Sequence, residues 1–441
     1  MQTDEPGAVV VLGALFGARY PRLVPAATER GLTVLGVDTR TPGKERFDQA
    51  RRSHPEHPLA GLAELVWIPG DRPEQVLDQV VRWSAGHRIR AVLAFGEDYV
   101  EAAAVVADCL GLPGPGLRAA RVCRNKLLQR RYLADVSPRS RLLPADRRVE
   151  AATDWAHFPA VVKPVGREAS SGVRRVADPA ALRAALAGYD DTEPVLVEEL
   201  VAGHEISVEA LVQHGEVIFS APTGKRTNES GGEFFVEMGH TAPDPELGPA
   251  RTAAVLQVNR EVLARLGFAD GIAHAEYRIT ADGRPVLMEI AARAAGDSIL
   301  ELYHLATGAP MEEALLTVAL GEPTSYPATR RYARQVYLPH PPGVLADVRA
   351  DGLDAPVTWL AERWMWPPVQ PRPADADASV QMVVAGRSVG AELTEIRQSG
   401  DRSTMFVIDA PSPAELDRLE ARCVAAVTVE VRAELPTAVA A

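Results

Sequence analysis

The sequence predicts a multidomain protein with α/β and α+β parts, and its length and two strand patterns support this prediction. At 441 residues the chain is too long for one simple hydrophobic core, so several packed units are expected. Residues 8–120 alternate apolar strands with helices, which predicts a parallel sheet covered on both faces. Residues 194–325 instead carry hairpin signals, which favour antiparallel strands. We therefore expect four units, which span residues 1–120, 121–193, 194–325 and 326–441.

The first unit is predicted from apolar strands that alternate with helices. The strand segments are AVVVLGAL, LTVLGVDT, LVWIPG and IRAVLAFGED. Helices are expected at residues 21–30 and 73–85, and over VEAAAVVADCLGL, where Gly111 ends the helix.

The second unit begins with a predicted helix, CRNKLLQRRYLADV. The strand FPAVVKPV, the loop VGREASSG and the strand VRRV follow it. A further helix is expected to begin at Asp178-Pro179, because Asp caps the free amides of a first turn and Pro is tolerated there.

The third unit is predicted from PVLVEEL, HEISVEALVQ and VIFSAP, which are typical of strands. Residues 224–248 contain Gly, Asn, Ser and Pro and are predicted to form a long irregular loop. Helices are expected at 249–267 and near 298–320. In the fourth unit we expect strands at QMVVAGRSVGAE and STMFVIDA, and a helix at residues 412–430.

Composition excludes several classes of function. The formal net charge is −12 and the pI is near 5.4, so the broad basic surface of a nucleic-acid-binding protein is not expected. No run of about 18 apolar residues is present, so no membrane span is expected. The three cysteines form no CxxC pair, which indicates a reducing compartment. We expect a cytoplasmic protein.

Two glutamates in a predicted hairpin suggest a metal site. IAHAEYRI and PVLMEIA read as strands, and the ADGR sequence between them is a signal for a two-residue type I′ turn. With Ala281 paired to Arg284, Glu276 lies opposite Glu289, and their Cβ atoms are roughly 5 Å apart. Such like charges are destabilising unless a divalent cation lies between them, and oxygen ligands favour Mg²⁺ or Mn²⁺. Taken alone, the pair fits two solvated glutamates on an exposed sheet face equally well.

A lysine and a serine-rich loop form a second candidate site. Lys163 ends an apolar strand, and the backbone N–H groups and serines of the following VGREASSG could wrap phosphate oxygens. The order is not that of a Walker A loop, and alone it also fits an ordinary connection between strands. Further along, Glu198 could accept a hydrogen bond from an exocyclic amine and Glu205 from ribose hydroxyls, or both could be exposed strand ends.

In their order along the chain, these segments resemble the ATP-grasp superfamily, and within it the carboxylate–amine ligases. VVKPVGREASSGV is similar to the second lysine and phosphate loop, closest to the serine-bearing loop of D-alanine–D-alanine ligases. VEELVAGHEISVE resembles the adenine and ribose segment, and HAEYRIT with VLMEIAARAAGDS resembles the metal hairpin. FGEDYVEAAAVVADCLGLPGPGLRAARVCRNK is similar to the segment that leads into the fold in L-amino acid ligases, the dipeptide synthetases. The resemblance implies an ATP-grasp fold with an N-terminal Rossmann-like domain and a C-terminal α+β subdomain.

The resemblance also implies site residues. It assigns ATP phosphate contacts to Lys126, Lys163, Ser170, Ser171 and Gly172, adenine to Glu198 and the Val201 backbone, ribose to Glu205, Mg²⁺ to Glu276 and Glu289, and the transferred phosphoryl group to Arg293. One position departs from the pattern: many members carry Asn where this chain has Ala291, which puts the coordination of a second metal in doubt.

His240 is a third catalytic candidate beside Lys163 and Arg293. It could contact phosphate or handle a proton, or it could be an ordinary loop histidine. The loop at 224–248, with Arg226, Glu229, Gly231 and Gly232, is expected to close over a water-sensitive intermediate.

The resemblance and the chemistry together predict an ATP-dependent ligase. It would join the carboxylate of an amino acid to an amine through an acyl phosphate and release ADP and phosphate. One alternative is a carboxylase or ligase that uses bicarbonate or another small carboxylate. The other is an inactive nucleotide-binding protein, which Ala291 keeps open. The expected partners are small substrates, and a homodimer is left open.

Overall fold

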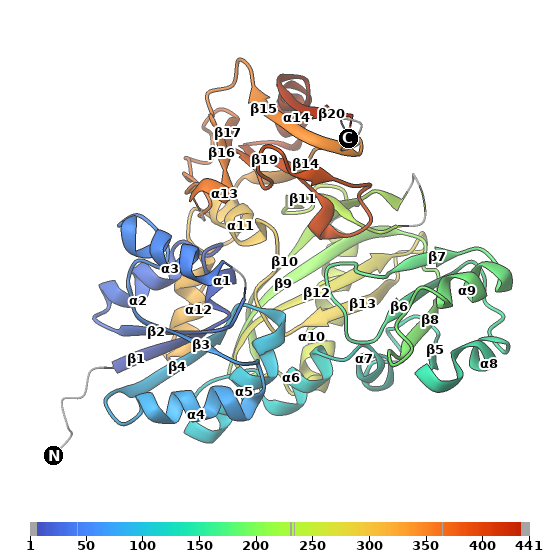
Figure 1. Ribbon diagram of the computed structural model, residues 1–441, viewed down its shortest axis with the longest axis horizontal. Coiled ribbons are helices and arrows are strands. Elements are labelled where there is room, and N and C mark those ends of the chain that lie inside the picture. Colours follow the sequence, from blue (N-terminus) through green and yellow to red (C-terminus); the bar gives the residue numbers. More distant parts are fainter. Residues whose placement is uncertain (1–6, 42, 230–231, 233, 364, 434–441) are drawn as a thin grey trace, which may run out of the picture.

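The computed structural model describes residues 7–41, 43–229, 232, 234–363 and 365–433. In Figure 1 the N-terminal unit and the small unit formed by residues 126–199 lie on opposite sides of a set of long central strands. The C-terminal part of the chain covers a third side. The molecule is therefore arranged around a central junction at which all three parts meet.

The N-terminal unit is a parallel sheet, as predicted. Its four strands lie in the order β3-β2-β1-β4. Its strands are β1 (Gly7–Leu12), β2 (Thr33–Thr39), β3 (Leu62–Ile68) and β4 (Arg88–Ala94). β1 is buried from Ala8 to Leu12 because helices cover both faces of the sheet, which explains its continuous apolar run. The helices are α1 (Ala14–Gly17), α2 (Leu23–Glu29), α3 (Lys44–Ser53), α4 (Pro73–Trp83), η1 (Glu97–Tyr99) and α5 (Val100–Leu110).

Two short helices lead into the small unit. The second lies within the predicted helix CRNKLLQRRYLADV, whereas the first was not predicted. Asn125 ends the first and caps the second, because its side chain accepts a hydrogen bond from the Leu128 N–H at 3.1 Å. The helices are α6 (Leu117–Cys123) and α7 (Lys126–Tyr132).

The small unit is an antiparallel sheet in the order β5-β8-β6-β7 with helices beside it. Asp178 caps the last helix as predicted, by accepting from the N–H groups of Ala180 and Ala181. β8 pairs with β5 and β6, so the predicted boundary at residue 193 separates β8 from the sheet in which it lies. The elements are β5 (Ser140–Leu143), η2 (Ala145–Arg147), α8 (Arg148–Ala152), β6 (Ala160–Pro164), β7 (Arg174–Val176), α9 (Pro179–Leu186) and β8 (Val195–Glu199).

A nine-stranded sheet runs through the centre of the molecule and across the predicted boundary at residue 325. Its order is β13-β12-β9-β10-β11-β14-β19-β17-β16, and β11 pairs with β14 over Gly239 to Ala242. The third and fourth predicted units therefore share one sheet. Its strands are β9 (His204–Gln213), β10 (Glu216–Thr227), β11 (Glu237–Ala242), β12 (Gly271–Ile279), β13 (Pro285–Ala291), β14 (Tyr332–Tyr337), β16 (Val357–Trp359), β17 (Ser379–Ala385) and β19 (Thr404–Ala410).

A small antiparallel sheet in the order β18-β15-β20 completes the C-terminal part. The helices of this half of the chain lie beside the two sheets. The remaining elements are α10 (Gly248–Leu266), α11 (Ile299–Thr307), α12 (Met311–Ala319), β15 (Gly343–Ala350), α13 (Leu360–Arg363), β18 (Glu392–Leu393), η4 (Ser399–Asp401), α14 (Pro413–Ala426) and β20 (Val427–Arg432).

The prediction of one long irregular loop at residues 224–248 is wrong in two segments, which form strands. β10 continues to Thr227 and β11 begins at Glu237, because the two segments pair with each other and β11 pairs with β14. Hydrogen bonds from both neighbours stabilise a strand whose own sequence is not typical of one. Gly231, predicted to be part of a lid, lies outside the described residues.

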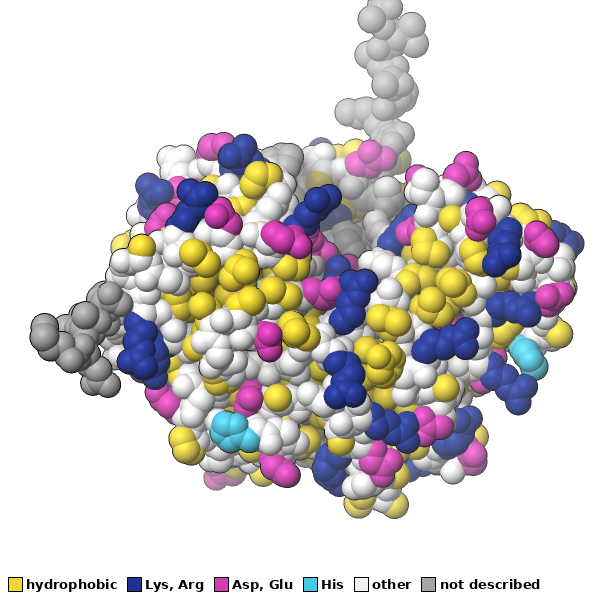
Figure 2. All heavy atoms as spheres, turned by 90° about the horizontal axis from the view of Figure 1, so that it is seen from below, with side chains coloured by type: hydrophobic (Ala, Val, Ile, Leu, Met, Phe, Trp, Pro, Cys, Tyr) yellow, Lys and Arg dark blue, Asp and Glu magenta, His cyan; other side chains and the backbone are white. Residues whose placement is uncertain are grey.

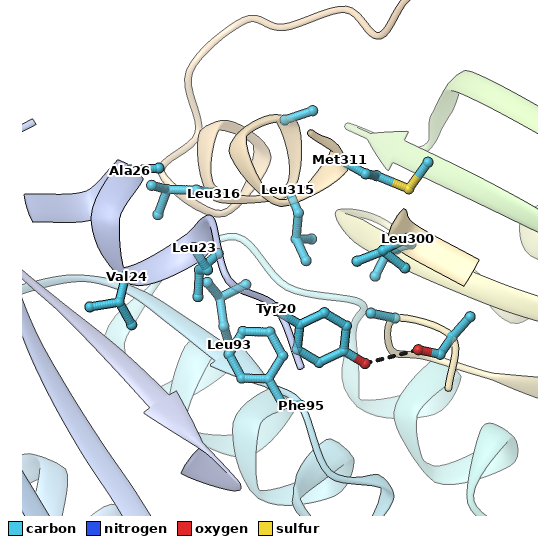
Figure 3. Close-up of a cluster of buried hydrophobic side chains, with 14 of the residues drawn as sticks. Tyr20, Leu23, Val24, Ala26, Leu93, Phe95, Leu300, Met311, Leu315 and Leu316 are labelled. Atoms are coloured by element: carbon cyan, nitrogen blue, oxygen red, sulfur yellow. Dashed lines mark hydrogen bonds between the residues drawn. The ribbon is translucent and has the colours of Figure 1, made fainter. Parts of the chain in front are cut away.

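A hydrophobic cluster joins the N-terminal unit to α11 and α12. Figure 3 shows Leu23 and Phe95 facing the helix that carries Leu315. Tyr20 lies in the same cluster and donates a hydrogen bond from its hydroxyl to the Ala295 carbonyl at 2.9 Å. This contact fixes the N-terminal unit beside the segment that follows the β12–β13 hairpin.

The outer surface carries charges of both signs. The face shown in Figure 2 mixes Lys and Arg side chains with Asp and Glu side chains. Among the residues that the structure describes, no helix has both the length and the apolar character needed to cross a membrane.

Candidate active site

A cavity of about 680 Å³ lies where the three parts of the molecule meet. Its volume lies within the range of about 300–1,000 Å³ that is typical of ligand pockets. Every predicted site residue lines this cavity except Gly172, which lines a neighbouring smaller one. The fold therefore brings together residues that are far apart in the sequence.

Glu276 and Glu289 face each other across β12 and β13 as predicted, although the turn differs from the prediction. Thr280 pairs with Arg284, so the turn has three residues and not two, with Gly283 at φ 85°. This shifts the register near the turn by one residue. A β-bulge at Met288 shifts it back and restores the Glu276–Glu289 pair.

Lysines neutralise both glutamates. Lys225 Nζ is 2.6 Å from Glu276 and Lys126 Nζ is 2.9 Å from Glu289. Burial alone would raise the pKa of Glu276, but Lys225 and then His274 hold it well below its usual range. Burial alone would lower the pKa of Lys225, but Glu276, Glu237 and Glu205 raise it well above its usual value. Both groups are therefore charged at neutral pH.

His274 lies between Glu276 and a second, buried glutamate, Glu209. Its Nδ1 is 2.9 Å from the buried Glu209, and its Nε2 is 3.3 Å from Glu276. Burial lowers the pKa of His274, but Glu209 and Glu276 outweigh burial and raise the pKa to about 9. His274 thus adds positive charge beside the predicted metal ligands.

Lys163 and Glu198 form a buried ion pair at 2.7 Å, and Arg130 binds the same carboxylate at 2.6 Å. Burial would raise the pKa of Glu198, but Arg130 and Lys163 lower it. Burial lowers the pKa of Lys163, and Glu198 opposes that shift. The contact of Glu198 with adenine stays a prediction.

The loop after Lys163 has backbone geometry suited to exposing N–H groups. Ala169 and Ser170 have φ values of 55° and 58°, and Gly172 has φ 75°. Ser170 donates from its hydroxyl to the Phe235 carbonyl at 3.1 Å. Such left-handed residues are uncommon outside glycine and are found at ligand-binding loops.

Glu205 lies in a charged group at another part of the cavity. Arg278 binds Glu205 at 2.6 Å and Glu229 at 2.7 Å, and it donates to the Val201 carbonyl at 3.1 Å. The predicted ribose residue and the predicted adenine backbone are thereby held together by one guanidinium.

Arg293 and His240 each pair with an acidic residue. Arg293 binds Glu97 of the N-terminal unit. Burial lowers the pKa of Arg293, but Glu97 outweighs it and raises the pKa above its usual value. His240 Nε2 is 2.8 Å from Asp297, whereas its buried Nδ1 has no hydrogen-bond partner among the described residues.

The C-terminal part completes the cavity. Arg402 binds Asp297 at 2.8 Å, and its guanidinium lies 3.9 Å from the centre of the Tyr337 ring. Tyr337 donates to Asp297 at 2.9 Å. Burial would raise the pKa of Asp297, but Arg402 and then His240 hold it well below its usual range.

Sequence analysis missed Lys225, Arg278, Asp297 and Arg402. Lysine scarcity could have revealed the first: the chain has four lysines, and Lys126, Lys163 and Lys225 all line the cavity. Where arginine is otherwise the common cation, a retained lysine indicates a need for a compact point charge. The other residues gave no local signal.

The donor set fits one magnesium ion. Mg²⁺ commonly binds one or two protein carboxylates together with substrate phosphates, and Glu276 and Glu289 are two such carboxylates on one face. Ala291, opposite His274, offers no oxygen from its side chain. Within the described residues, no group of three or more His, Cys, Asp or Glu side chains has the arrangement of a metal site.

Comparison with known proteins identifies the fold class of the chain. Residues 156–301 match the family model of the ATP-grasp domain. An L-amino acid ligase from Bacillus licheniformis superimposes with a TM-score of 0.73 at 20% identity, covering 97% of this chain and 99% of the other. The protein therefore has the ATP-grasp fold, which confirms the predicted fold class.

Curated relatives match over shorter segments. A D-alanine–D-alanine ligase from Stutzerimonas stutzeri is 34% identical over 25% of this chain and 37% of its own length. An alanine–anticapsin ligase from Bacillus subtilis is 23% identical over 60% of each chain. The chain thus spans 37% to 60% of the length of the curated relatives that it matches.

Other solved structures share the fold at lower identity. A carboxyaminoimidazole ribonucleotide synthase from Aspergillus clavatus, solved with ATP, has a TM-score of 0.65 at 16% identity and covers 96% of this chain and 99% of its own.

Proposed function

We propose that the protein is an ATP-dependent ligase that joins the carboxylate of an amino acid to the amine of a second substrate. One observation carries the proposal: a single cavity holds the paired glutamates, three lysines and Arg293. The curated relatives that match it in sequence are named as ligases of amino acids.

The charges suit phosphoryl transfer to a carboxylate. Three anionic groups must meet, namely the triphosphate, the attacking carboxylate and the metal ligands, and positive charge must balance them. Lys126, Lys163 and Lys225 are each at most 7% exposed, so water screens their charges little. Glu276 and Glu289 would hold Mg²⁺, which neutralises phosphate oxygens when bound. Displacement of Lys225 and Lys126 from these carboxylates would free both ammonium groups for phosphate.

The second step needs an uncharged amine. Its nitrogen lone pair forms the C–N bond, the bond from the carbonyl carbon to the phosphate oxygen breaks, and phosphate leaves with that electron pair. The amine proton must then be removed. His240 lines the cavity, and its buried Nδ1 has no hydrogen-bond partner among the described residues, while Asp297 holds the opposite ring nitrogen. We infer that this Nδ1 accepts the proton once the substrate is bound.

The test is ATP consumption over pairs of amino acids, with mass detection of the product. The proposal expects ADP release only when an acid and an amine are both present, together with one condensed product. Glu289→Ala should abolish turnover while leaving most of the fold intact, because Glu289 lies at the cavity wall with its side chain 34% exposed. Release of ADP that depends on bicarbonate would instead favour a carboxylase, and full activity of Glu289→Ala would remove the metal assignment. A homodimer stays a prediction.

A further inference from the structure

The cavity has an aromatic region distinct from its phosphate region. Phe16, Tyr20 and Phe95 of the N-terminal unit line it, as do Leu360 and Trp366 of the C-terminal part. In Figure 1, α1 and α13 lie on the side of the central strands away from β6, β7 and β8. This region is therefore well placed to receive a substrate group that is not part of the nucleotide.

Arg19 is the charged group in this region. Its guanidinium carbon lies 5.7 Å from the centre of the Phe16 ring and 6.0 Å from that of Trp366. Both distances are typical of cation–π contacts, which hold the guanidinium in place without neutralising it.

Arg19 lacks the acidic partner that most other arginines of the cavity have. Ion pairs with carboxylates hold Arg167, Arg278, Arg293 and Arg402. Within the described part of the chain, the Arg19 side chain forms neither an ion pair nor a hydrogen bond. An arginine at a cavity wall with its donors free is suited to bind a carboxylate in the bidentate manner.

Among the described residues, Glu301 forms no ion pair with Arg19. Burial, and after it Glu312, raises the pKa of Glu301 well above its usual value, whereas Arg19 lowers it. Arg19 also lies near Tyr20. Burial raises the pKa of Tyr20 to about 12, and both Arg293 and Arg19 oppose that shift.

We propose that this region binds the amine substrate as an α-amino acid, with its carboxylate on Arg19 and a large apolar side chain against Phe16 and Trp366. The inference rests on the proposed function. The carboxylate of the acyl donor reacts beside Arg293 and becomes the carbonyl of the new amide. The acceptor keeps its own carboxylate, and this group needs a second cation to bind it. Phe16 is 43% exposed, so an apolar side chain would cover it.

Titration calorimetry with L-phenylalanine and L-phenylalaninamide tests the subsite without turnover. Wild-type protein with ADP and Mg²⁺ should bind the acid at least about ten-fold more tightly than the amide, since only the acid carries the carboxylate. Arg19→Met should abolish this preference by weakening the acid alone. Phe16→Ala should weaken both ligands by a similar factor.

Arg22→Met is the matched control. Arg22 lies three positions away, pairs with Glu313 at 3.2 Å and does not line the cavity. It should keep the wild-type preference. Equal binding of acid and amide by wild type, no binding of either, or an unchanged preference in Arg19→Met would each overturn the proposal.

Turnover with phenylalanine and a pool of other amino acids distinguishes this inference from the proposed function. Mass spectrometry should find phenylalanine at the carboxyl end of the product, and phenylalanine at the amino end would overturn the acceptor assignment. The expected calorimetric preference without any ADP release would refute the ligase and leave the subsite standing. Amide products formed equally well by wild type and Arg19→Met would refute the subsite and leave the ligase standing.

Discussion

At the scale of single residues, Lys225 is the cation shared by three carboxylates near the β12–β13 hairpin. Its side chain is 1% exposed and lies 2.6 Å from Glu276, 3.3 Å from Glu237 and 3.6 Å from Glu205. Three carboxylates this close would repel one another strongly without a cation between them. The charge of Lys225 therefore stabilises the folded structure before any ligand binds.

Lys225→Met is expected to lower the free energy of unfolding by about 3 kcal/mol, because it leaves buried carboxylates uncompensated. Urea denaturation followed by circular dichroism measures this loss. Lys44→Met is the matched control, since Lys44 is the one lysine outside the cavity and pairs with Glu45 only at 3.7 Å. It should change stability by less than about 0.5 kcal/mol. Equal stability of the two variants would contradict the role given to Lys225.

At the scale of elements, the predicted phosphate loop at residues 165–172 is connected to the C-terminal part. The Ser399 N–H at the start of η4 donates to the Ala169 carbonyl at 3.2 Å, and the Ser399 hydroxyl donates to Glu237 at 3.1 Å. Arg402, just after η4, donates to the Glu237 carbonyl at 2.8 Å. These bonds hold the left-handed backbone of the phosphate loop from outside.

Ser399→Pro removes the N–H that reaches Ala169, and Pro is tolerated at the first position of a helical turn. Hydrogen exchange of the amides in residues 167–173 should become faster in this variant, because the loop loses its outer hydrogen bond. Ser399→Ala keeps the N–H and removes only the hydroxyl, so its exchange in this segment should match wild type. Faster exchange in both variants would show that the hydroxyl, and not the backbone bond, restrains the loop.

Helices α11 and α12 each bury a carboxyl group. Glu301 and Glu312 are 5% and 3% exposed, and burial raises the pKa of both. In the unfolded chain each ionises near its ordinary pKa, so between that value and the raised pKa the unfolded state binds fewer protons. Stability therefore falls as pH rises through this window.

Glu301→Gln cannot ionise, so its stability should exceed that of wild type by a margin that grows as pH rises above the ordinary glutamate pKa of about 4.3. Denaturation at several pH values measures the margin. Glu322→Gln, at a side chain 50% exposed, should follow the wild-type pH dependence. A margin for Glu301→Gln that shrinks with rising pH would contradict the raised pKa of Glu301.

At the scale of the whole molecule, the central sheet makes about the last quarter of the chain inseparable from the rest. β14 pairs with β11 over four residues, and Met382, Val384, Met405 and Val407 of the C-terminal strands belong to the same hydrophobic cluster as Leu23 and Leu300. The active-site cavity also takes part of its wall from this region.

A chain that ends at residue 325 is therefore expected to aggregate, because it exposes the edge of β11 and part of the main hydrophobic cluster. Size-exclusion chromatography after expression measures this outcome. A chain that ends at residue 433 keeps every described element and should behave as the full chain does. A folded monomer of residues 1–325 would show that the C-terminal part is an independent domain.

The sequence alone determined the features that depend on neighbours in the chain. Continuous apolar strands predicted the parallel sheet, Asp178 marked a helix start, and the motif order predicted the ATP-grasp fold. It also placed Glu276 opposite Glu289, although the pair depends on a bulge at Met288 that the pattern did not show. These features follow from local periodicity and turn chemistry, which a single segment carries.

Only the tertiary structure decided the features that depend on distant partners. Segments within the predicted loop at 224–248 became strands because β11 gained partners on both sides, and β8 joined the sheet of the small unit. The pairs of Arg293 with Glu97 and of Arg402 with Asp297 join positions 196 and 105 residues apart. Ion pairs of this kind leave no local pattern in the sequence, because the two charged residues come together only when the chain folds.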